Sequence, residues 1–372
     1  MNNAGRPLIA VFASFSGHGG VEKMLSHLCS YLAESGFAVD LLMVKTRSSY
    51  LQQLSPRVRS VPLGTEHTYS ALPELVRYLK THRPTALLAA KDRANQTAIL
   101  ARMMAKTDTR VVVRMGTTVS EALKSKGQIH RLAWALPIRW LYPKADAIVA
   151  VSRGVAKDLV RFAGIPEDTL TVVPNPVIAP QLFESAAAPI SHPWFNGGET
   201  PVLVGMGRLT RQKDFPTLLR AFQIVRSRRL SRLVILGEGR DRVSLEALAS
   251  QLGIREDVDL PGFVPNPYPF LRKASVFVLS SIWEGSPNAL TEALALGTPV
   301  VATDCPSGPR EILQAGRVAP LVPMRNPHAM AQAVLDMLDH PPHKERLQEA
   351  AAPYTAENSA RRYLEVLLKR PI

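Results

Sequence analysis

Short apolar runs alternate along the chain with longer stretches in which apolar residues recur at helical spacing. The runs that predict buried strands are residues 8–13, 38–44, 86–90, 111–113, 147–151, 201–206, 232–236, 276–279 and 299–302. Residues 21–35 and 154–163 predict helices between the strands, as do the apolar positions at Leu218, Phe222 and Val225. Strands that alternate with helices in this way predict an α/β fold, with parallel sheets covered by helices on both faces.

The segment 174–200 separates two such halves. It contains several prolines, a Ser/Ala-rich stretch and the turn signal Asn196-Gly197-Gly198, which are typical of a linker. We therefore predict two doubly wound domains, residues 1–180 and 181–355, followed by a C-terminal helix within 356–372. Sheets of this kind bind ligands at the carboxyl ends of their strands, so the loops that follow the strands are the places to look for chemistry.

Composition excludes several classes of protein. No apolar run reaches the roughly 18 uncharged residues that span a bilayer, and the N-terminus shows no secretory signal. Cys29 and Cys305 lie far apart in the sequence and indicate reduced thiols instead of a disulfide framework. These features predict a cytoplasmic protein.

The chain is strongly basic, with 45 Lys and Arg against 31 Asp and Glu and a formal net charge of +14. Most of the excess lies in residues 1–180 and indicates either an anionic partner or only a solvated basic surface. No homeodomain, zinc-finger, RNP or KH pattern favours nucleic acid. Residues 124–142 interleave Lys and Arg with Leu, Trp and Tyr, a pattern typical of a helix in a membrane interface or of an ordinary helix buried on one face.

A glycine-rich loop, Gly17-His18-Gly19-Gly20-Val21-Glu22, follows the first predicted strand and opens a helix. Glycines allow backbone amides to approach an anion there, and the helix N-terminus adds partial positive charge. A dinucleotide site is disfavoured, because Glu22 replaces the third glycine of that fingerprint and Lys45 stands where an acidic residue is needed.

The loop after the first strand of the second half contains Arg208 and Lys213. A guanidinium fork and an ammonium point charge at this spacing can converge on a diphosphate. A glycine turn with solvated basic residues is the plainer alternative.

The strongest signal lies between Glu284 and Glu292. Glu284 falls in the loop after the predicted strand 276–279, and Glu292 falls about one turn inside the next helix. The backbone N–H groups of Asn288, Ala289 and Leu290 open that helix, where a phosphate or a sugar hydroxyl is favoured. Carboxylates on either side of such amides suit a nucleotide sugar, although an acidic first turn also stabilises a helix without any ligand.

Other constellations carry less weight. Asp257 and Asp259 superficially match a metal-binding pair but have no third ligand nearby, and His340 and His343 flank two prolines. No Ser-His-Asp, Cys-His or P-loop pattern is present. We expect no metal.

Taken together, these motifs resemble glycosyltransferase family 4, retaining enzymes with the GT-B fold, in which two Rossmann-like domains face each other across a cleft. The resemblance also implies that the C-terminal helix, within 356–372, packs back on the N-terminal domain. The matching residues are Gly19-Gly20-Val21-Glu22, Val151-Ser152, Pro174-Asn175-Pro176, Gly207-Arg208-Leu209, Lys213, Gly237-Glu238-Gly239, Pro261-Gly262-Phe263, Glu284 and Glu292. Their order and spacing match over nearly the whole chain. Residues 304–313 are similar to a subgroup that builds bacterial surface or lipid-linked oligosaccharides.

The resemblance implies a role for each matching position. Arg208 and Lys213 would bind the donor diphosphate, and Glu284 would hold the hydroxyls of the transferred sugar. The turn at Gly19 and Gly20 would approach the diphosphate from the other domain, and Glu292 would hold the ribose hydroxyls. The other implied donor contacts are Gly207 in the loop of Arg208, Phe263 and Val264 at the nucleobase, Ser286 in the donor pocket, and the backbone of Asn288, Ala289 and Leu290 at the phosphate and sugar.

The acceptor side departs from the family pattern. Many relatives carry a His just after the strand that corresponds to 111–113, where this chain has Arg114. The family is thought to use same-face attack, in which the leaving phosphate accepts the acceptor's proton, so activity does not require that His. His18, Glu22 and Arg114 are the acceptor-side candidates, with Arg114 placed to meet an acceptor phosphate.

The resemblance implies a metal-independent hexosyltransferase without a resident cofactor. It would move a sugar from a UDP- or GDP-sugar to a glycan or lipid-linked saccharide during surface polysaccharide or lipopolysaccharide synthesis. Peripheral contact with an anionic membrane, at the inner face of the plasma membrane, fits the basic first half, and no nucleic acid is expected. The alternatives are a sugar-nucleotide hydrolase or epimerase on the same fold and a basic nucleic-acid-binding module.

Overall fold

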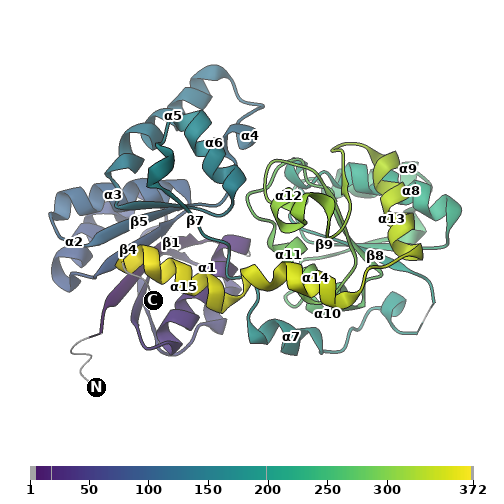
Figure 1. Cartoon of the computed structure of the whole chain (residues 1–372), viewed down its shortest axis with the longest axis horizontal. Coiled ribbons are helices and arrows are strands. Elements are labelled where there is room, and N and C mark those ends of the chain that lie inside the picture. Colours follow the sequence, from purple (N-terminus) through teal and green to yellow (C-terminus); the bar gives the residue numbers. More distant parts are fainter. Residues whose placement is uncertain (1–5, 18, 198, 370–372) are drawn as a thin grey trace. The chain divides into compact units, whose positions relative to one another are not determined.

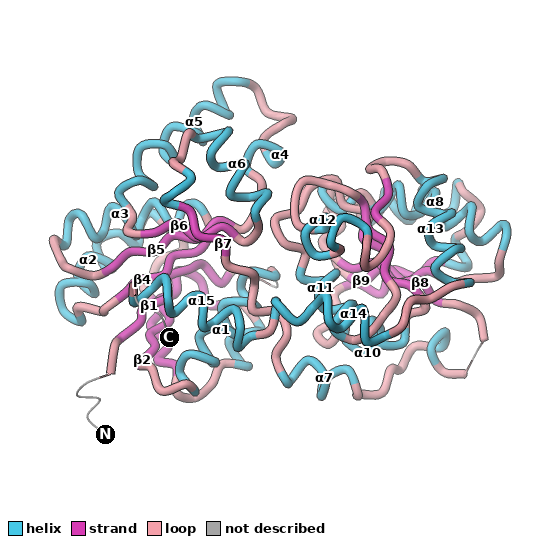
Figure 2. Tube along the Cα trace, in the orientation of Figure 1, coloured by secondary structure: helices cyan, strands magenta, loops and turns pink. Residues whose placement is uncertain are grey.

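The computed structural model describes residues 6–17, 19–197 and 199–369, which form two compact units (Figure 1). Unit 1 comprises Met1–Val177 and Thr355–Ile372, and unit 2 comprises Ile178–Tyr354. The divisions expected from the sequence, 180/181 and 355/356, lie three residues and one residue later. The two parallel sheets and their covering helices are drawn in Figure 2.

Unit 1 is built on a seven-stranded parallel sheet in the order β3-β2-β1-β4-β5-β6-β7. Its strands are β1 (Leu8–Phe15), β2 (Ala38–Thr46), β3 (Val58–Pro62), β4 (Ala86–Ala90), β5 (Arg110–Met115), β6 (Ala147–Ala150) and β7 (Leu170–Val172). Its helices are α1 (Gly20–Glu34), α2 (Leu72–His82), α3 (Asp92–Ala105), α4 (Val119–Ala122), α5 (Gln128–Leu141), α6 (Arg153–Ala163) and α15 (Ala356–Leu368). Strands β3 and β7, at the two edges, were not predicted.

Unit 2 is built on a six-stranded parallel sheet in the order β10-β9-β8-β11-β12-β13. Its strands are β8 (Val202–Met206), β9 (Arg232–Leu236), β10 (Val258–Gly262), β11 (Val276–Leu279), β12 (Val300–Thr303) and β13 (Leu321–Val322). Its helices are α7 (Pro180–Ala186), α8 (Phe215–Arg228), α9 (Arg242–Gln251), α10 (Tyr268–Lys273), α11 (Asn288–Ala295), α12 (Pro309–Ile312), α13 (Pro327–Asp339) and α14 (Lys344–Ala351). None of the helices in the described part of the chain is both long enough and apolar enough to cross a membrane.

The sheet of unit 1 is buried on both faces, which explains why its strands read as continuous apolar runs. Along β1, Ala10 and Phe12 belong to the core on one face, and Ile9 and Val11 belong to the core on the other. Successive side chains of a strand point to opposite faces, so each face requires its own layer of helices.

Helix α15 completes one of these layers, although its sequence follows unit 2. Its buried side chains Tyr363, Leu364 and Leu367 lie in the same core as β1 and α1. Arg110 on β5 donates to the Val366 carbonyl at 2.8 Å, which fixes the end of the helix against the sheet. The last helix is therefore part of the first unit's core.

Both cysteines are free and buried, and burial raises the pKa of each thiol to about 12. The thiolate is the reactive form, so we expect both thiols of the folded protein to resist a disulfide reagent such as DTNB at pH 8. Two thiols should react promptly once denaturant is added. A rapid stoichiometric reaction of the native protein would contradict this expectation.

Candidate functional site

The order of the strands in unit 2 reverses between β8 and β11, and the loops after these two strands leave the same edge of the sheet. This is the switch point at which open parallel sheets bind ligands. The loop after β8 carries Arg208 and Lys213, and the loop after β11 carries Glu284. Sheet topology thus brings together residues that are more than seventy positions apart in the chain.

Glycines allow the loop after β8 to lie close to its neighbours. Gly207 has a φ of 154°, and a Cβ there would lie 2.7 Å from Cε of Lys213. Gly237, at the end of β9, has a φ of 140°, and a Cβ there would lie only 2.0 Å from the Gly207 carbonyl oxygen. The Gly237-Glu238-Gly239 turn, which the sequence alone made only a weak signal, is a packing surface for the loop that carries Arg208 and Lys213.

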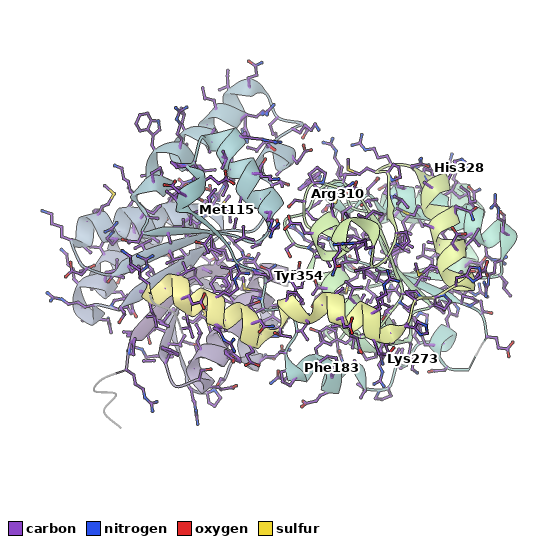
Figure 3. The ribbon with its side chains drawn as sticks, viewed as in Figure 1. Met115, Phe183, Lys273, Arg310, His328 and Tyr354 are labelled. Atoms are coloured by element: carbon purple, nitrogen blue, oxygen red, sulfur yellow. The ribbon has the colours of Figure 1, made fainter. Side chains whose placement is uncertain are left out.

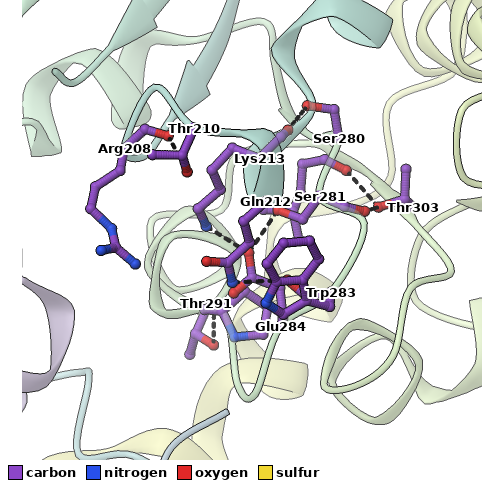
Figure 4. Close-up of polar contacts among 12 residues, drawn as sticks. Arg208, Thr210, Gln212, Lys213, Ser280, Ser281, Trp283, Glu284, Thr291 and Thr303 are labelled. Atoms are coloured by element: carbon purple, nitrogen blue, oxygen red, sulfur yellow. Dashed lines mark hydrogen bonds and ion pairs between the residues drawn. The ribbon is translucent and has the colours of Figure 1, made fainter. Parts of the chain in front are cut away.

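Lys213 and Glu284 form the central contact of the site (Figure 4). The Lys213 Nζ lies 2.6 Å from Oε1 of Glu284, and their side chains are 16% and 9% exposed. The Ser281 hydroxyl donates to the same carboxylate oxygen at 2.6 Å. An ion pair this sheltered from water is screened far less than a surface pair.

Hydrogen bonds to the backbone join the two loops around this ion pair. Ser280 Oγ donates to the Lys213 carbonyl at 2.6 Å, and Gln212 Nε2 donates to the Trp283 carbonyl at 2.9 Å. The Ile282 N–H in turn donates to the Gln212 carbonyl at 2.9 Å. These contacts hold the Lys213 stem and the Glu284 loop in one arrangement before any ligand binds.

Arg208 lies beside this cluster but takes no part in it. Its side chain is exposed and extends away from the ion pair (Figure 4). Within the described residues the guanidinium has no hydrogen-bond or ion-pair partner. The backbone carbonyl of Arg208 accepts a hydrogen bond from the Thr210 hydroxyl at 3.5 Å. A guanidinium in this position keeps its full set of donors for an anion.

Helix α11 begins at Asn288, directly after the loop that carries Glu284. The Leu290 N–H donates to the Pro287 carbonyl at 3.1 Å, and the half-buried Asn288 and Ala289 precede it at the start of the helix. Glu292 is 2% exposed and lies in the second turn of the helix. The positive end of the helix dipole therefore lies beside the buried ion pair.

The other donor-side residues predicted from the sequence lie on the same unit. Phe263 follows β10 and is 38% exposed, an apolar ring at the carboxyl edge of the sheet. Val264 and Ser286 are partly buried. The structure leaves their ligand contacts as predictions.

The acidic pair considered for a metal is used within the protein. Asp257 pairs with Arg226 at 2.7 Å and with Arg232, and Asp259 accepts from His192 Nε2 at 3.0 Å. The described residues contain no group of three or more His, Cys, Asp or Glu side chains that could hold a metal ion.

In unit 1 the strand order reverses between β1 and β4, and Glu22 lies at that point. Its carboxylate is 3% exposed and accepts from the backbone N–H groups of Ser16 and Gly17, both at 3.2 Å. The glycine-rich loop is thus held by Glu22 at the start of α1, which gives this acidic residue a positioning role. Gly19 and Gly20 open α1, and His18 lies outside the described residues.

Lys91 is a residue of this site that sequence analysis missed. It follows β4, and its Nζ lies 2.9 Å from Oε1 of Glu22 and 2.8 Å from the Ser14 carbonyl oxygen. Its φ of 80° is uncommon for a residue with a side chain, and such strain concentrates at functional sites. The signal that could have found it is its position after a strand that neighbours β1.

A buried polar network continues from Lys91 into α3. Tyr142 donates its hydroxyl proton to Asp92 at 2.8 Å and lies 3.2 Å from the sulfur of Met115, which is labelled in Figure 3. Burial raises the pKa of the Asp92 carboxyl, although hydrogen bonds from Tyr142 and Gln96 act in the opposite direction. The network fixes the first turn of α3 beside the glycine-rich loop.

Arg114 lies in the core and not at the edge of the site. It is 2% exposed, its Nε donates to the Tyr363 hydroxyl at 3.0 Å, and its Nη2 donates to Asn175 Oδ1 at 2.6 Å. The guanidinium thus joins β5 to α15 and to the Pro174-Asn175-Pro176 motif. The structure offers no support for a contact between Arg114 and an acceptor phosphate, because water barely reaches the side chain.

Comparison with known proteins identifies the family. Residues 190–353 match the family model described as glycosyl transferases group 1, and residues 19–176 match a glycosyl transferase 4-like domain. The chain is 30% identical over 339 residues to a Campylobacter jejuni N-acetylgalactosamine-N,N'-diacetylbacillosaminyl-diphospho-undecaprenol 4-alpha-N-acetylgalactosaminyltransferase, covering 89% of this chain and 90% of that protein. The chain belongs to the group 1 glycosyltransferases. The resemblance to glycosyltransferase family 4 drawn from the sequence motifs is thereby confirmed.

Other relatives of this glycosyltransferase agree. It is 25% identical to the Rhizobium meliloti lipopolysaccharide core biosynthesis glycosyltransferase LpsE, covering 96% of this chain and 98% of that one. A crystal structure of Anabaena HepE in complex with UDP-glucose matches 98% of this chain and 100% of its own, with a TM-score of 0.79 at 15% identity. The two parallel-sheet units are the Rossmann-like domains of the GT-B fold, as the sequence predicted.

Proposed function

We propose that this glycosyltransferase moves a sugar, with retention, from a nucleotide-diphosphate-sugar to a glycan or lipid-linked saccharide acceptor in surface polysaccharide or lipopolysaccharide synthesis. The observation that carries the proposal is the sheltered Lys213–Glu284 pair beside the N-terminus of α11, with Arg208, whose guanidinium has no partner among the described residues, on the same loop as Lys213. Two cations and a helix N-terminus suit a diphosphate, and the buried carboxylates Glu284 and Glu292 suit the hydroxyls of a sugar and a ribose.

The relatives named above support the class of donor and acceptor. HepE was crystallised with UDP-glucose, and the Campylobacter enzyme is named for an acceptor saccharide on diphospho-undecaprenol. A UDP- or GDP-sugar donor and a lipid-linked acceptor are therefore our proposal for this chain. The named curated relatives are transferases, which favours transfer to an acceptor over hydrolysis or epimerisation.

In the proposed reaction the acceptor hydroxyl oxygen forms a bond to the anomeric carbon on the face from which the diphosphate departs. The bond between that carbon and the diphosphate oxygen breaks, and the leaving diphosphate takes the acceptor's proton. Lys213, Arg208 and the N–H groups of Asn288 and Ala289 would stabilise the negative charge that grows on the diphosphate. Glu284 would orient the sugar, and its contact with Ser281 would keep the carboxylate in place.

The proposal is tested by thermal stability of the whole chain against UDP-, GDP-, ADP- and dTDP-sugars, with NAD and a short DNA duplex as controls. A ligand that binds only the native state raises the melting temperature, so one class of nucleotide sugar should do so. Incubation of that donor with a saccharide on a polyprenyl diphosphate should then extend the saccharide. Stabilisation by DNA alone would contradict the proposal.

The variant Arg208→Ala is expected to weaken donor binding without changing the stability of the folded protein. Because the guanidinium is exposed and unpaired among the described residues, we expect the melting temperature without ligand to stay unchanged. Loss of charge-assisted hydrogen bonds to the diphosphate should weaken donor affinity by about 10- to 100-fold, from roughly 1.5–3 kcal/mol. The measurement is donor titration calorimetry, with Arg211→Ala as the matched exposed control. Equal affinity of Arg208→Ala and the parent chain would remove Arg208 from the site.

A further inference from the structure

Helix α5 is apolar on two faces, and only one of them is covered. Trp134, Ile138 and Leu141 pack toward the core of unit 1. A second stripe, Ile129, Leu132, Leu136 and Trp140, recurs every three or four residues and is 87%, 57%, 42% and 68% exposed. A surface helix of a water-soluble domain ordinarily has a polar outer face. An exposed apolar stripe of this kind indicates a surface that binds a partner.

The surroundings of this stripe are positively charged. Exposed Lys124 and Lys126 precede the helix, Arg139 lies within it, and Lys144 follows it. Between residues 93 and 146 the acidic residues are Asp108, Glu121 and Asp146, of which Glu121 pairs with Lys124 and Asp146 with Arg102. A partner for this surface must therefore be apolar where it meets the stripe and anionic around it.

A groove of about 420 Å³ lies where Lys144 follows the C-terminal end of α5. It is lined by Arg102, Met103, Lys106, Thr107 and Lys144. Met103 and the neighbouring Met104 on α3 are 43% and 56% exposed, which extends the apolar surface onto a second helix. Arg102 pairs with Asp146 at 3.8 Å and donates to the Lys144 carbonyl at 2.7 Å, so Lys106 and Lys144 are the cations of this partly apolar groove that suit a phosphate group joined to a hydrocarbon chain. Figure 1 shows α5 and α3 on unit 1, to which this surface is confined.

We propose that the outward stripe of α5, together with the groove at Lys144, docks unit 1 onto an anionic lipid bilayer. Tryptophan favours the boundary between headgroups and acyl chains, where the indole ring is apolar and its N–H remains hydrated. The leucines and the isoleucine would enter the acyl boundary while the flanking lysines and arginines meet lipid phosphates. A second copy of this chain is a poorer partner, because two such surfaces would bring like charges together.

The proposed lipid-linked acceptor explains why the enzyme would bind a bilayer, because docking would hold the enzyme where that acceptor is. The inference rests on the proposed function in this respect alone. Its test does not involve catalysis. The whole chain is sedimented with vesicles of phosphatidylcholine alone and with vesicles in which about one lipid in three is phosphatidylglycerol. We expect binding to the anionic vesicles, weakened by salt, and little binding to the neutral ones.

Variants test whether the stripe of α5 and its flanking lysines are the part of the chain that binds the vesicles. Leu132→Ser with Trp140→Ser should reduce binding to the anionic vesicles by about tenfold or more. Val243→Ser with Leu230→Ser, which removes exposed apolar side chains from unit 2, should leave binding unchanged. Lys126→Gln with Lys144→Gln should weaken binding and reduce its dependence on salt. Stabilisation by the donor nucleotide sugar shows that each variant is folded.

Three results would overturn the proposal. The first is binding of the Leu132→Ser/Trp140→Ser variant to anionic vesicles as tightly as the parent chain. The second is absence of binding of the parent chain to either kind of vesicle. The third is a dimer in solution that this same variant converts to a monomer, which would assign the stripe to a second copy of the chain. Loss of transferase activity on a saccharide in solution would count against the proposed function and not against this surface.

Discussion

Replacement of Lys213 by Met is expected to lower kcat/KM by about 10²- to 10³-fold and the free energy of unfolding by about 3–5 kcal/mol. The first effect follows from losing a cation that faces the departing diphosphate. The second follows because the Glu284 carboxylate, 9% exposed, would be left in the site without the ammonium 2.6 Å away. Initial rates and denaturant unfolding measure the two effects.

The double variant Lys213→Met/Glu284→Gln separates the two effects. Removal of both charges leaves no buried carboxylate that has lost its ammonium, so most of the lost stability should return. Activity should stay low, because neither the cation nor the carboxylate is restored. A double variant that regained activity would show that Lys213 does not act on the diphosphate, and a single variant as stable as the parent would show that the ion pair contributes nothing to folding.

The second large effect, a loss of stability, is expected from Gly237→Ala. We propose no ligand contact for Gly237. A Cβ at this position would lie 2.0 Å from the Gly207 carbonyl oxygen, and the φ of 140° already disfavours any side chain. The backbone must move to admit the Cβ, because the atoms in its way belong to the main chain of Gly207 and not to a flexible side chain. We expect a loss of about 3 kcal/mol or more in unfolding free energy from overpacking and strain together.

Gly253→Ala is the matched control for this variant. Gly253 also has a positive φ, 69°, but no atom lies within 4 Å of its added Cβ, so only about 1 kcal/mol of backbone strain is expected. Thermal unfolding of both variants measures the difference. Because Gly237 supports the loop of Lys213, its variant should also bind the donor more weakly, whereas Gly253→Ala should bind it normally. Equal stability of the two variants would refute the packing role of the turn.

The sequence predicted the architecture because strands buried on both faces have a distinctive pattern. Residues 86–90 and 232–236, for example, were predicted as strands with the same bounds as β4 and β9. The edge strand β3 contains exposed polar positions and a proline and does not form an apolar run, so periodicity did not predict it. The short β13 has two residues, too few for any pattern.

The site was predictable only in part, because its contacts are set by sheet order. Arg208, Lys213 and Glu284 were predicted from separate motifs, but nothing in either motif indicated that Lys213 and Glu284 pair. The sequence did not indicate a role for Lys91, because its partner Glu22 is 69 residues away in the chain. The two side chains come together because β1 and β4 are neighbours in the sheet. Arg114 looked available because its position follows a strand; its burial depends on Tyr363, 249 residues later.

The contribution of α15 to unit 1 has a consequence for the order in which the chain is made. A ribosome releases residues 1–177 long before residues 356–368, so unit 1 emerges with part of one face of its sheet uncovered and with the Arg114 guanidinium lacking Tyr363. Unit 2 is a continuous stretch and can assemble in the meantime. The first domain in the sequence is therefore the last to finish folding, and the nascent chain must keep an exposed apolar sheet face from aggregating until synthesis is nearly complete.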